Sequence, residues 1–220
     1  EDKVFFPSGG IQLEGLLNIQ EALSIRGGLV LCHPHPQYGG EMHNNVINRA
    51  LGVAREEGFA TLRFNFRGVG ESGGSYSEGV GEKEDVRSAI GYLDSKLNHS
   101  GVPILILGYS FGAWVGLPIA VAEERVKGVV AVSPPLEMFD FDYFKSCKKK
   151  KLIIVGDKDA FCPSSLLEEW YEQLQEPKSL AIIQGADHFY SYQTKHIIQP
   201  LREFLSETVL SSEFGVRSQE

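Results

Sequence analysis

Three residue types that together perform nucleophilic catalysis occur in order along this chain. Ser110 lies in the pattern G-x-S-x-G over residues 108–112, and Asp159 and His188 follow it. A serine hydroxyl becomes a good nucleophile when a base removes its proton, and an imidazole base needs a partner that fixes its tautomer and stabilises its charged form. We therefore interpret Ser110 as the nucleophile, His188 as the base and Asp159 as the acid.

The context of the serine strengthens this interpretation. Residues 104–107 form an apolar run typical of a buried parallel strand, and the segment after Gly112 indicates a helix. A serine on the turn between such elements is a nucleophile elbow, with its hydroxyl projecting from the sheet edge. The turn is so tight that side chains at 108 and 112 would clash, which the two glycines avoid.

The residues alone leave two candidates for the acid. Asp157 and Asp159 both follow the apolar run 152–155 and Gly156. An aspartate directly after a strand glycine often caps a turn through its own side chain. Asp157 therefore has a purely structural interpretation, whereas Asp159 could accept a hydrogen bond from the imidazole of His188.

Strands that alternate with helices must position these residues. We expect an N-terminal hairpin with strands at 3–6 and 11–19. Six further strands are expected at 28–32, 60–66, 104–108, 128–133, 152–156 and 179–183. Five helices are expected near 42–57, 82–98, after 112, 165–173 and 196–210. This alternation predicts an α/β fold with a mostly parallel central sheet and helices on both faces. Ligands of such sheets bind beyond the carboxyl ends of the strands. The glycine-rich loop 67–74 follows one strand, and we interpret it as a turn whose Arg67 braces neighbouring loops.

Composition restricts the class of protein. The 220 residues suit one domain, 1–220, with a polar and frayed tail at 211–220. A net charge of -8 argues against nucleic acid or an anionic membrane as partner, and no apolar run is long enough to span a bilayer. Three cysteines without metal-type spacing predict neither a disulfide framework nor a metal site, and we expect a cytoplasmic protein without a cofactor.

Several segments resemble the α/β-hydrolase superfamily. They are GYSFG at 108–112, FRGVGESGG at 66–74, GDKDAFCP at 156–163 and DHF at 187–189. The segment HPHPQYGG at 33–40 is similar to hydrolases close to the dienelactone hydrolases. The resemblance, from about residue 11 to 210, implies an α/β-hydrolase fold and a triad of Ser110, Asp159 and His188, which favours Asp159 over Asp157. Dienelactone hydrolases carry a cysteine nucleophile, so the serine here shifts the expectation toward esterase chemistry.

Two backbone amides are candidates for the oxyanion hole. One is the N–H of Phe111, which follows the nucleophile at a helix start. Related hydrolases carry a segment similar to His-Gly-X after the strand that corresponds to 28–32, and the backbone N–H of X is their second donor. When that segment is aligned on His33 of this chain, X corresponds to His35. Prolines at 34 and 36 have no N–H, which leaves His35 as the nearest donor and Gln37 as the second.

The insert at 134–151 is only 18 residues long, so we expect a minimal lid or none and a shallow, open site. Its apolar wall could include Tyr38, Trp114, Phe161 and Phe189. These features predict a serine hydrolase of small carboxylic esters, as a monomer or homodimer. A thioesterase or small-peptide hydrolase would use the same triad, and a non-catalytic binding protein would share the fold.

Overall fold

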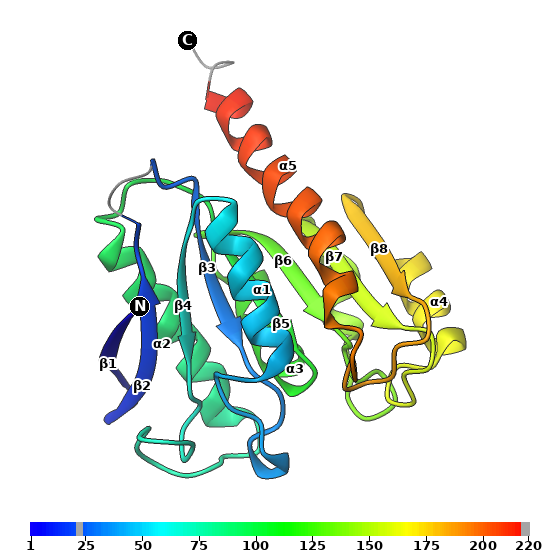
Figure 1. The fold of residues 1–220 in the computed structure, drawn as a ribbon, viewed down its shortest axis with the longest axis horizontal. Coiled ribbons are helices and arrows are strands. Elements are labelled where there is room, and N and C mark those ends of the chain that lie inside the picture. Colours follow the sequence, from blue (N-terminus) through cyan, green and yellow to red (C-terminus); the bar gives the residue numbers. More distant parts are fainter. Residues whose placement is uncertain (21–23, 217–220) are drawn as a thin grey trace.

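The computed structural model describes residues 1–20 and 24–216, which form one eight-stranded sheet (Figure 1). Its strands are β1 (Asp2–Ser8), β2 (Ile11–Asn18), β3 (Gly27–Cys32), β4 (Phe59–Phe64), β5 (Ile104–Tyr109), β6 (Val126–Val132), β7 (Lys150–Gly156) and β8 (Lys178–Ile183). Their order across the sheet is β1-β2-β4-β3-β5-β6-β7-β8. β1 pairs antiparallel with β2, and β2 with β4, whereas all other neighbouring strands are parallel.

Helices cover both faces of this sheet. They are α1 (Asn45–Glu56), α2 (Val80–Lys96), α3 (Phe111–Ala122), α4 (Ser164–Gln173) and α5 (Ile198–Val216), with short 3-10 helices η1 (Pro36–Tyr38), η2 (Asp142–Ser146) and η3 (Thr194–Ile197). α2, α3 and α4 pack their apolar residues into one core, and α1 and α5 pack theirs into a second core on the opposite face. The predicted α/β-hydrolase fold, with its N-terminal antiparallel hairpin, is confirmed.

The centre of the sheet explains why the elbow lies where it does. Every residue of β3, β4 and β5 is buried, as expected for parallel strands covered on both faces. β3 lies between β4 and β5, in register from Gly28 with Ile104 to Cys32 with Gly108. The carboxyl ends of these strands therefore lie side by side, and the loops that follow them meet at one edge.

The largest differences from the expected element bounds are at two helices. α1 begins at Asn45 rather than near residue 42, because the Asn44 side chain caps it by accepting a hydrogen bond from the Val46 N–H at 2.9 Å. α5 continues through residues 211–216, which we expected to lie in a frayed tail; the rest of that tail, 217–220, lies outside the described residues.

The connection between β6 and β7 contains only η2, so no helical lid lies between these strands. Within residues 1–20 and 24–216, no helix combines the length and apolar character that crossing a membrane requires. The cytoplasmic location and the monomeric or homodimeric state stay predictions.

Candidate active site

The turn from β5 into α3 places Ser110 in a backbone conformation that non-glycine residues rarely adopt. Its φ is 55° and its ψ is -117°, a strain that costs on the order of 1–3 kcal/mol. A Cβ added to Gly108 would lie 2.5 Å from the carbonyl oxygen of Gly112, and one added to Gly112 would overlap the carbonyl of Cys32 on β3. The glycines therefore admit both the tight turn and its close approach to the neighbouring strand.

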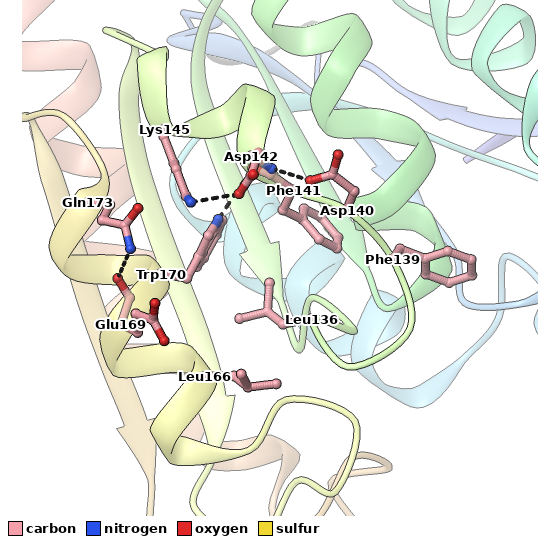
Figure 2. Close-up of a pocket in the computed structure, with 10 residues that line it drawn as sticks. All are labelled: Leu136, Phe139, Asp140, Phe141, Asp142, Lys145, Leu166, Glu169, Trp170 and Gln173. Atoms are coloured by element: carbon pink, nitrogen blue, oxygen red, sulfur yellow. Dashed lines mark hydrogen bonds and ion pairs between the residues drawn. The ribbon is translucent and has the colours of Figure 1, made fainter.

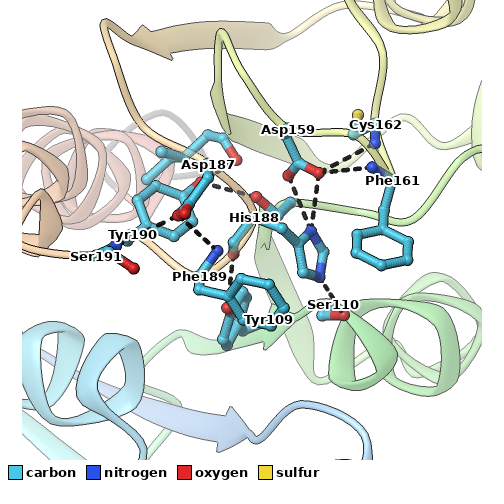
Figure 3. Close-up of polar contacts among 12 residues, drawn as sticks. Tyr109, Ser110, Asp159, Phe161, Cys162, Asp187, His188, Phe189, Tyr190 and Ser191 are labelled. Atoms are coloured by element: carbon cyan, nitrogen blue, oxygen red, sulfur yellow. Dashed lines mark hydrogen bonds and ion pairs between the residues drawn. The ribbon is translucent and has the colours of Figure 1, made fainter.

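Ser110, His188 and Asp159 form one hydrogen-bonded chain (Figure 3). The Asp159 carboxylate accepts from His188 Nδ1 at 2.9 and 3.0 Å, and His188 Nε2 lies 2.8 Å from Ser110 Oγ. Burial alone would raise the pKa of Asp159, but hydrogen bonds from His188 and other donors lower it below its usual range. An ionised Asp159 keeps the proton on Nδ1, which leaves Nε2 free to accept the serine proton.

The other candidate acid has a structural role. Asp157 is exposed, and its Oδ1 accepts a hydrogen bond from the N–H of Gly185 at 2.6 Å. It therefore joins the loop after β7 to the loop after β8 without contact to the imidazole. The structure brings Asp159, and not Asp157, to His188.

The two candidate oxyanion donors both line one cavity. Phe111 is the first residue of α3, where a helix N–H lacks an intrahelical partner. Within the part of the chain that the structure describes, neither the Phe111 N–H nor the His35 N–H donates a hydrogen bond. The Gln37 N–H, our second candidate, donates instead to His35 Nδ1 at 3.2 Å. His35 is therefore the better placed donor in this loop.

His33 fixes the start of the loop that carries His35. Its side chain is fully buried; Nδ1 donates to the Pro34 carbonyl at 2.6 Å, and Nε2 accepts the Phe66 N–H at 3.1 Å. Burial lowers the pKa of His33 to about 4. A neutral, immobile imidazole therefore connects the loop after β3 to the loop after β4.

Polar side chains from β2, from β4 and from Asn65, directly after β4, hold the far end of the same loop. Asn65 Oδ1 accepts the Met42 N–H at 2.9 Å, while Asn65 Nδ2 donates to Glu14 Oε2 at 2.9 Å. Arg63 donates to the Met42 carbonyl at 3.3 Å. Residues 33–42, here called the β3 loop, are thus anchored at both ends by buried hydrogen bonds.

Arg67 braces its own loop, but its partner lies on a helix and not in a neighbouring loop as we expected. Its guanidinium donates to both carboxylate oxygens of Asp85 on α2, at 2.7 and 3.0 Å, and the Asp85 carboxylate also accepts from Ser8. The glycine-rich loop is therefore held against α2 and β1. Among the described residues, no three or more His, Cys, Asp and Glu side chains are grouped to hold a metal ion.

The cavity beside the triad has a volume of about 580 Å³. It is lined by Pro34, His35, Tyr38, Gly39, Gly40, Asn44, Tyr109, Ser110, Phe111, Pro135, Met138, Phe139, Phe161, His188 and Phe189. This volume is that of a formed ligand pocket.

Three of the four predicted wall residues, Tyr38, Phe161 and Phe189, line this cavity, and Trp114 does not. Its ring instead stacks on Phe139, with centroids 3.9 Å apart and planes inclined by 13°, and also contacts Phe111. Trp114 therefore supports two lining side chains from behind. From its sequence position in the first turn of α3, lining the cavity and packing behind the cavity wall could not be distinguished.

A second hollow, of about 260 Å³, lies between the segment before β7 and α4 (Figure 2). Its polar side chains pair with their own neighbours: Lys145 with Asp142, and Gln173 with the Glu169 carbonyl. Phe139 borders both this hollow and the larger cavity. No triad residue reaches the smaller one.

Sequence reasoning missed three residues that support the triad. Tyr109 donates to the His188 carbonyl at 2.7 Å and so holds the backbone of that histidine. Ser133 contributes to lowering the pKa of the Asp159 carboxyl, and its Oγ lies 2.9 Å from the hydroxyl of Tyr190. The signal for Ser133 was its place directly after β6, at the same sheet edge.

Comparison with known proteins agrees with this architecture. The alpha/beta hydrolase domain family matches residues 29–208. An uncharacterized protein of Rickettsia prowazekii, RP471, is 33% identical over 184 residues, which are 80% of this chain and 77% of that protein.

Two solved structures cover nearly the whole chain. The Agrobacterium tumefaciens protein ATU1826, whose function is unknown, shares 29% identity with a TM-score of 0.88, over 96% of this chain and 97% of that one. XC6422 of Xanthomonas campestris, described as an α/β serine hydrolase without a lid, shares 26% identity with a TM-score of 0.84, over 94% of each chain. The family match spans both the elbow and the loop of His188, and the chain therefore belongs to the alpha/beta hydrolase domain family.

Proposed function

We propose that this protein is a serine hydrolase that cleaves small carboxylic esters through Ser110, His188 and Asp159. The family relation supports a hydrolase. The observation that carries the assignment is the continuous chain of hydrogen bonds from Asp159 through His188 to Ser110, beside a cavity that Phe111 and His35 also line. XC6422, a lidless serine hydrolase, supports the same chemistry.

The first half of the reaction forms an acyl-enzyme. Ser110 Oγ attacks the ester carbonyl carbon while His188 Nε2, 2.8 Å away, takes the hydroxyl proton. The negative charge that develops on the carbonyl oxygen is stabilised by the N–H groups of Phe111 and His35. As the tetrahedral intermediate collapses, the bond to the alkoxy oxygen breaks, and His188 donates its proton to that oxygen.

Water repeats these steps on the acyl-enzyme. His188 accepts a proton from the water that attacks the acyl carbon, and then returns it to Ser110 as the carboxylic acid leaves. Asp159 stays ionised throughout and stabilises the imidazolium that forms in each half.

Intact-protein mass after incubation with a fluorophosphonate tests the assignment. We expect one adduct on the wild type and none on Ser110→Ala, with hydrolysis of 4-nitrophenyl acetate reduced by about 10⁴-fold or more in the variant. Ser95→Ala removes an exposed serine on α2 and is the matched control. Retained labelling or activity in a folded Ser110→Ala protein contradicts the proposal.

The same experiment separates the alternatives. Labelled wild type that hydrolyses matched thioesters or peptides faster than oxygen esters would shift the assignment to a thioesterase or peptidase with this triad. A folded wild type that neither reacts nor turns over activated esters would favour a non-catalytic binding protein.

A further inference from the structure

The walls of the large cavity are free of formal charge apart from the titratable histidines. Among the described residues that line it, none is Asp, Glu, Lys or Arg. At its mouth, Tyr38, Met138 and Phe189 are 83%, 51% and 62% exposed, unusually high values for large apolar side chains. Exposed apolar side chains that gather around a pocket mark a surface for an apolar ligand.

Two acidic side chains lie next to the wall of the cavity, around His188. Asp159 lies directly behind His188 and is ionised, and Asp187 lies one residue before the same histidine, where it accepts the Phe189 N–H at 3.0 Å. A carboxylate or phosphate on a substrate would lose water on entry and would meet no cation in exchange. The cavity is thus unfavourable to anionic substrates on two separate grounds.

The position of the imidazole locates the alcohol part of an ester. His188 Nε2 must reach the leaving oxygen to protonate it, so the group attached to that oxygen begins beside the imidazole. Two phenylalanine rings flank that imidazole: the centroid of Phe161 lies 4.6 Å from it and that of Phe189 lies 5.6 Å from it (Figure 3). Both rings line the cavity.

We propose that the substrates are neutral esters whose alcohol part carries an aromatic ring, bound between Phe161 and Phe189, and that esters with an anionic group are rejected. This inference rests on the proposed function and names its substrate class. In the first step the Ser110 Oγ–acyl bond forms and the acyl–alkoxy bond breaks. The serine proton passes through His188 to the leaving oxygen, so an arylmethanol departs. Aromatic rings prefer offset or edge-to-face partners, which two inclined phenylalanines provide.

Three acetate esters test the charge preference: benzyl acetate, and 4-carbamoylbenzyl and 4-carboxybenzyl acetate, which are nearly equal to each other in shape and differ in charge. Their reacting centres are alike, so differences in kcat/KM report the distal group. We expect benzyl acetate to exceed 4-carboxybenzyl acetate by about 100-fold, with the neutral amide between them, because a carboxylate is costly to desolvate without a partner. Cyclohexylmethyl acetate, apolar but not aromatic, should be several-fold slower than benzyl acetate.

Variants of the two rings test the location. Phe161→Leu and Phe189→Leu should each reduce the preference for benzyl over ethyl acetate by about 5-fold to 10-fold. Phe5→Leu changes an exposed phenylalanine on β1 and is the matched control. Equal kcat/KM for the neutral and anionic esters, or an unchanged preference in both ring variants, overturns the inference. Fluorophosphonate labelling of the same preparations shows whether the proposed function itself has failed, because an unlabelled wild type defeats both.

Discussion

The two sides of the cavity differ in what holds the groups that are proposed to act in catalysis. On the side of the loops after β7 and β8, the groups proposed to do chemistry hold one another: Asp159 orients His188, and His188 contacts Ser110. On the side of the β3 loop, the group proposed to act is a backbone N–H, that of His35, and the loop is held by residues to which we assign no chemistry. Buried His33 fixes one end of that loop and Asn65 fixes the other.

This difference decides how each side responds to substitution. Where side chains act directly, replacing one removes its chemistry and leaves the fold intact. Where a backbone amide acts, a substitution affects it either by removing the N–H, as proline does, or by breaking the hydrogen bonds that hold the loop. Breaking those buried hydrogen bonds also lowers the free energy of unfolding. Substitutions in the loops after β7 and β8 should therefore lower the reaction rate alone, whereas substitutions in the β3 loop and its anchors should lower both the rate and the stability.

The largest effect is expected on the side of the acid. Asp159→Asn should lower kcat by about 10⁴-fold, because an amide in this place favours the wrong imidazole tautomer. Asp157→Asn is the matched control; its carboxylate contacts Gly185 and not His188, so kcat should stay near wild type. Steady-state kinetics on one ester, with thermal melting to verify folding, makes the measurement. A larger loss in Asp157→Asn would reverse the assignment of the acid.

A smaller effect is expected on the side of the amide. His35 has a φ of -57°, which proline also adopts, so His35→Pro removes the N–H at a compatible backbone angle. His35→Ala removes the imidazole and keeps the N–H. We expect kcat of the proline variant to be about 10²-fold to 10³-fold below that of the alanine variant, the effect of one oxyanion donor. Equal rates in two folded variants would show that the second donor is elsewhere.

The contrast between the two sides also explains what the sequence could predict. A nucleophile, an acid and a base must be particular residue types at strand ends, so Ser110 and His188 were found from their types and spacing, and the glycines at 108 and 112 from the turn they permit. The choice of Asp159 over Asp157 required the family resemblance.

The anchors of the β3 loop left no such pattern. The contact between Asn65 and Glu14 joins residues 51 positions apart and depends on the pairing of β2 with β4. Whether Trp114 would line the cavity or support Phe139 depended on side-chain packing, which no local spacing encodes. The fold was predictable because alternating apolar runs determine it, whereas supporting contacts depend on tertiary structure.

The last prediction concerns stability and not rate: it tests the anchor of the β3 loop through its pH dependence. Burial holds the pKa of His33 near 4, whereas an unfolded chain would give it the ordinary value of 6.5. Between these values the unfolded state binds a proton that the folded state does not, so stability falls as pH falls. Above pH 6.5 both states are neutral and nothing is lost. Through His33, the free energy of unfolding should fall by about 3 kcal/mol as the pH is lowered from 6.5 to 4. Below pH 4 both states bind the proton, so His33 causes no further loss.

Urea unfolding of the wild type and of His33→Gln over this pH range isolates that contribution from those of the carboxylates. Glutamine cannot take up a proton, so the free energy of unfolding should fall less steeply in the variant, by up to about 1.4 kcal/mol per pH unit. Because the variant also loses the fit of the imidazole, its slope and not its absolute stability is the readout. NMR titration of the wild-type ring gives an independent check. A His33 that protonates near pH 6.5 in the folded protein would mean that the β3 loop opens readily, and that the anchored side of the cavity is no more rigid than an ordinary surface loop.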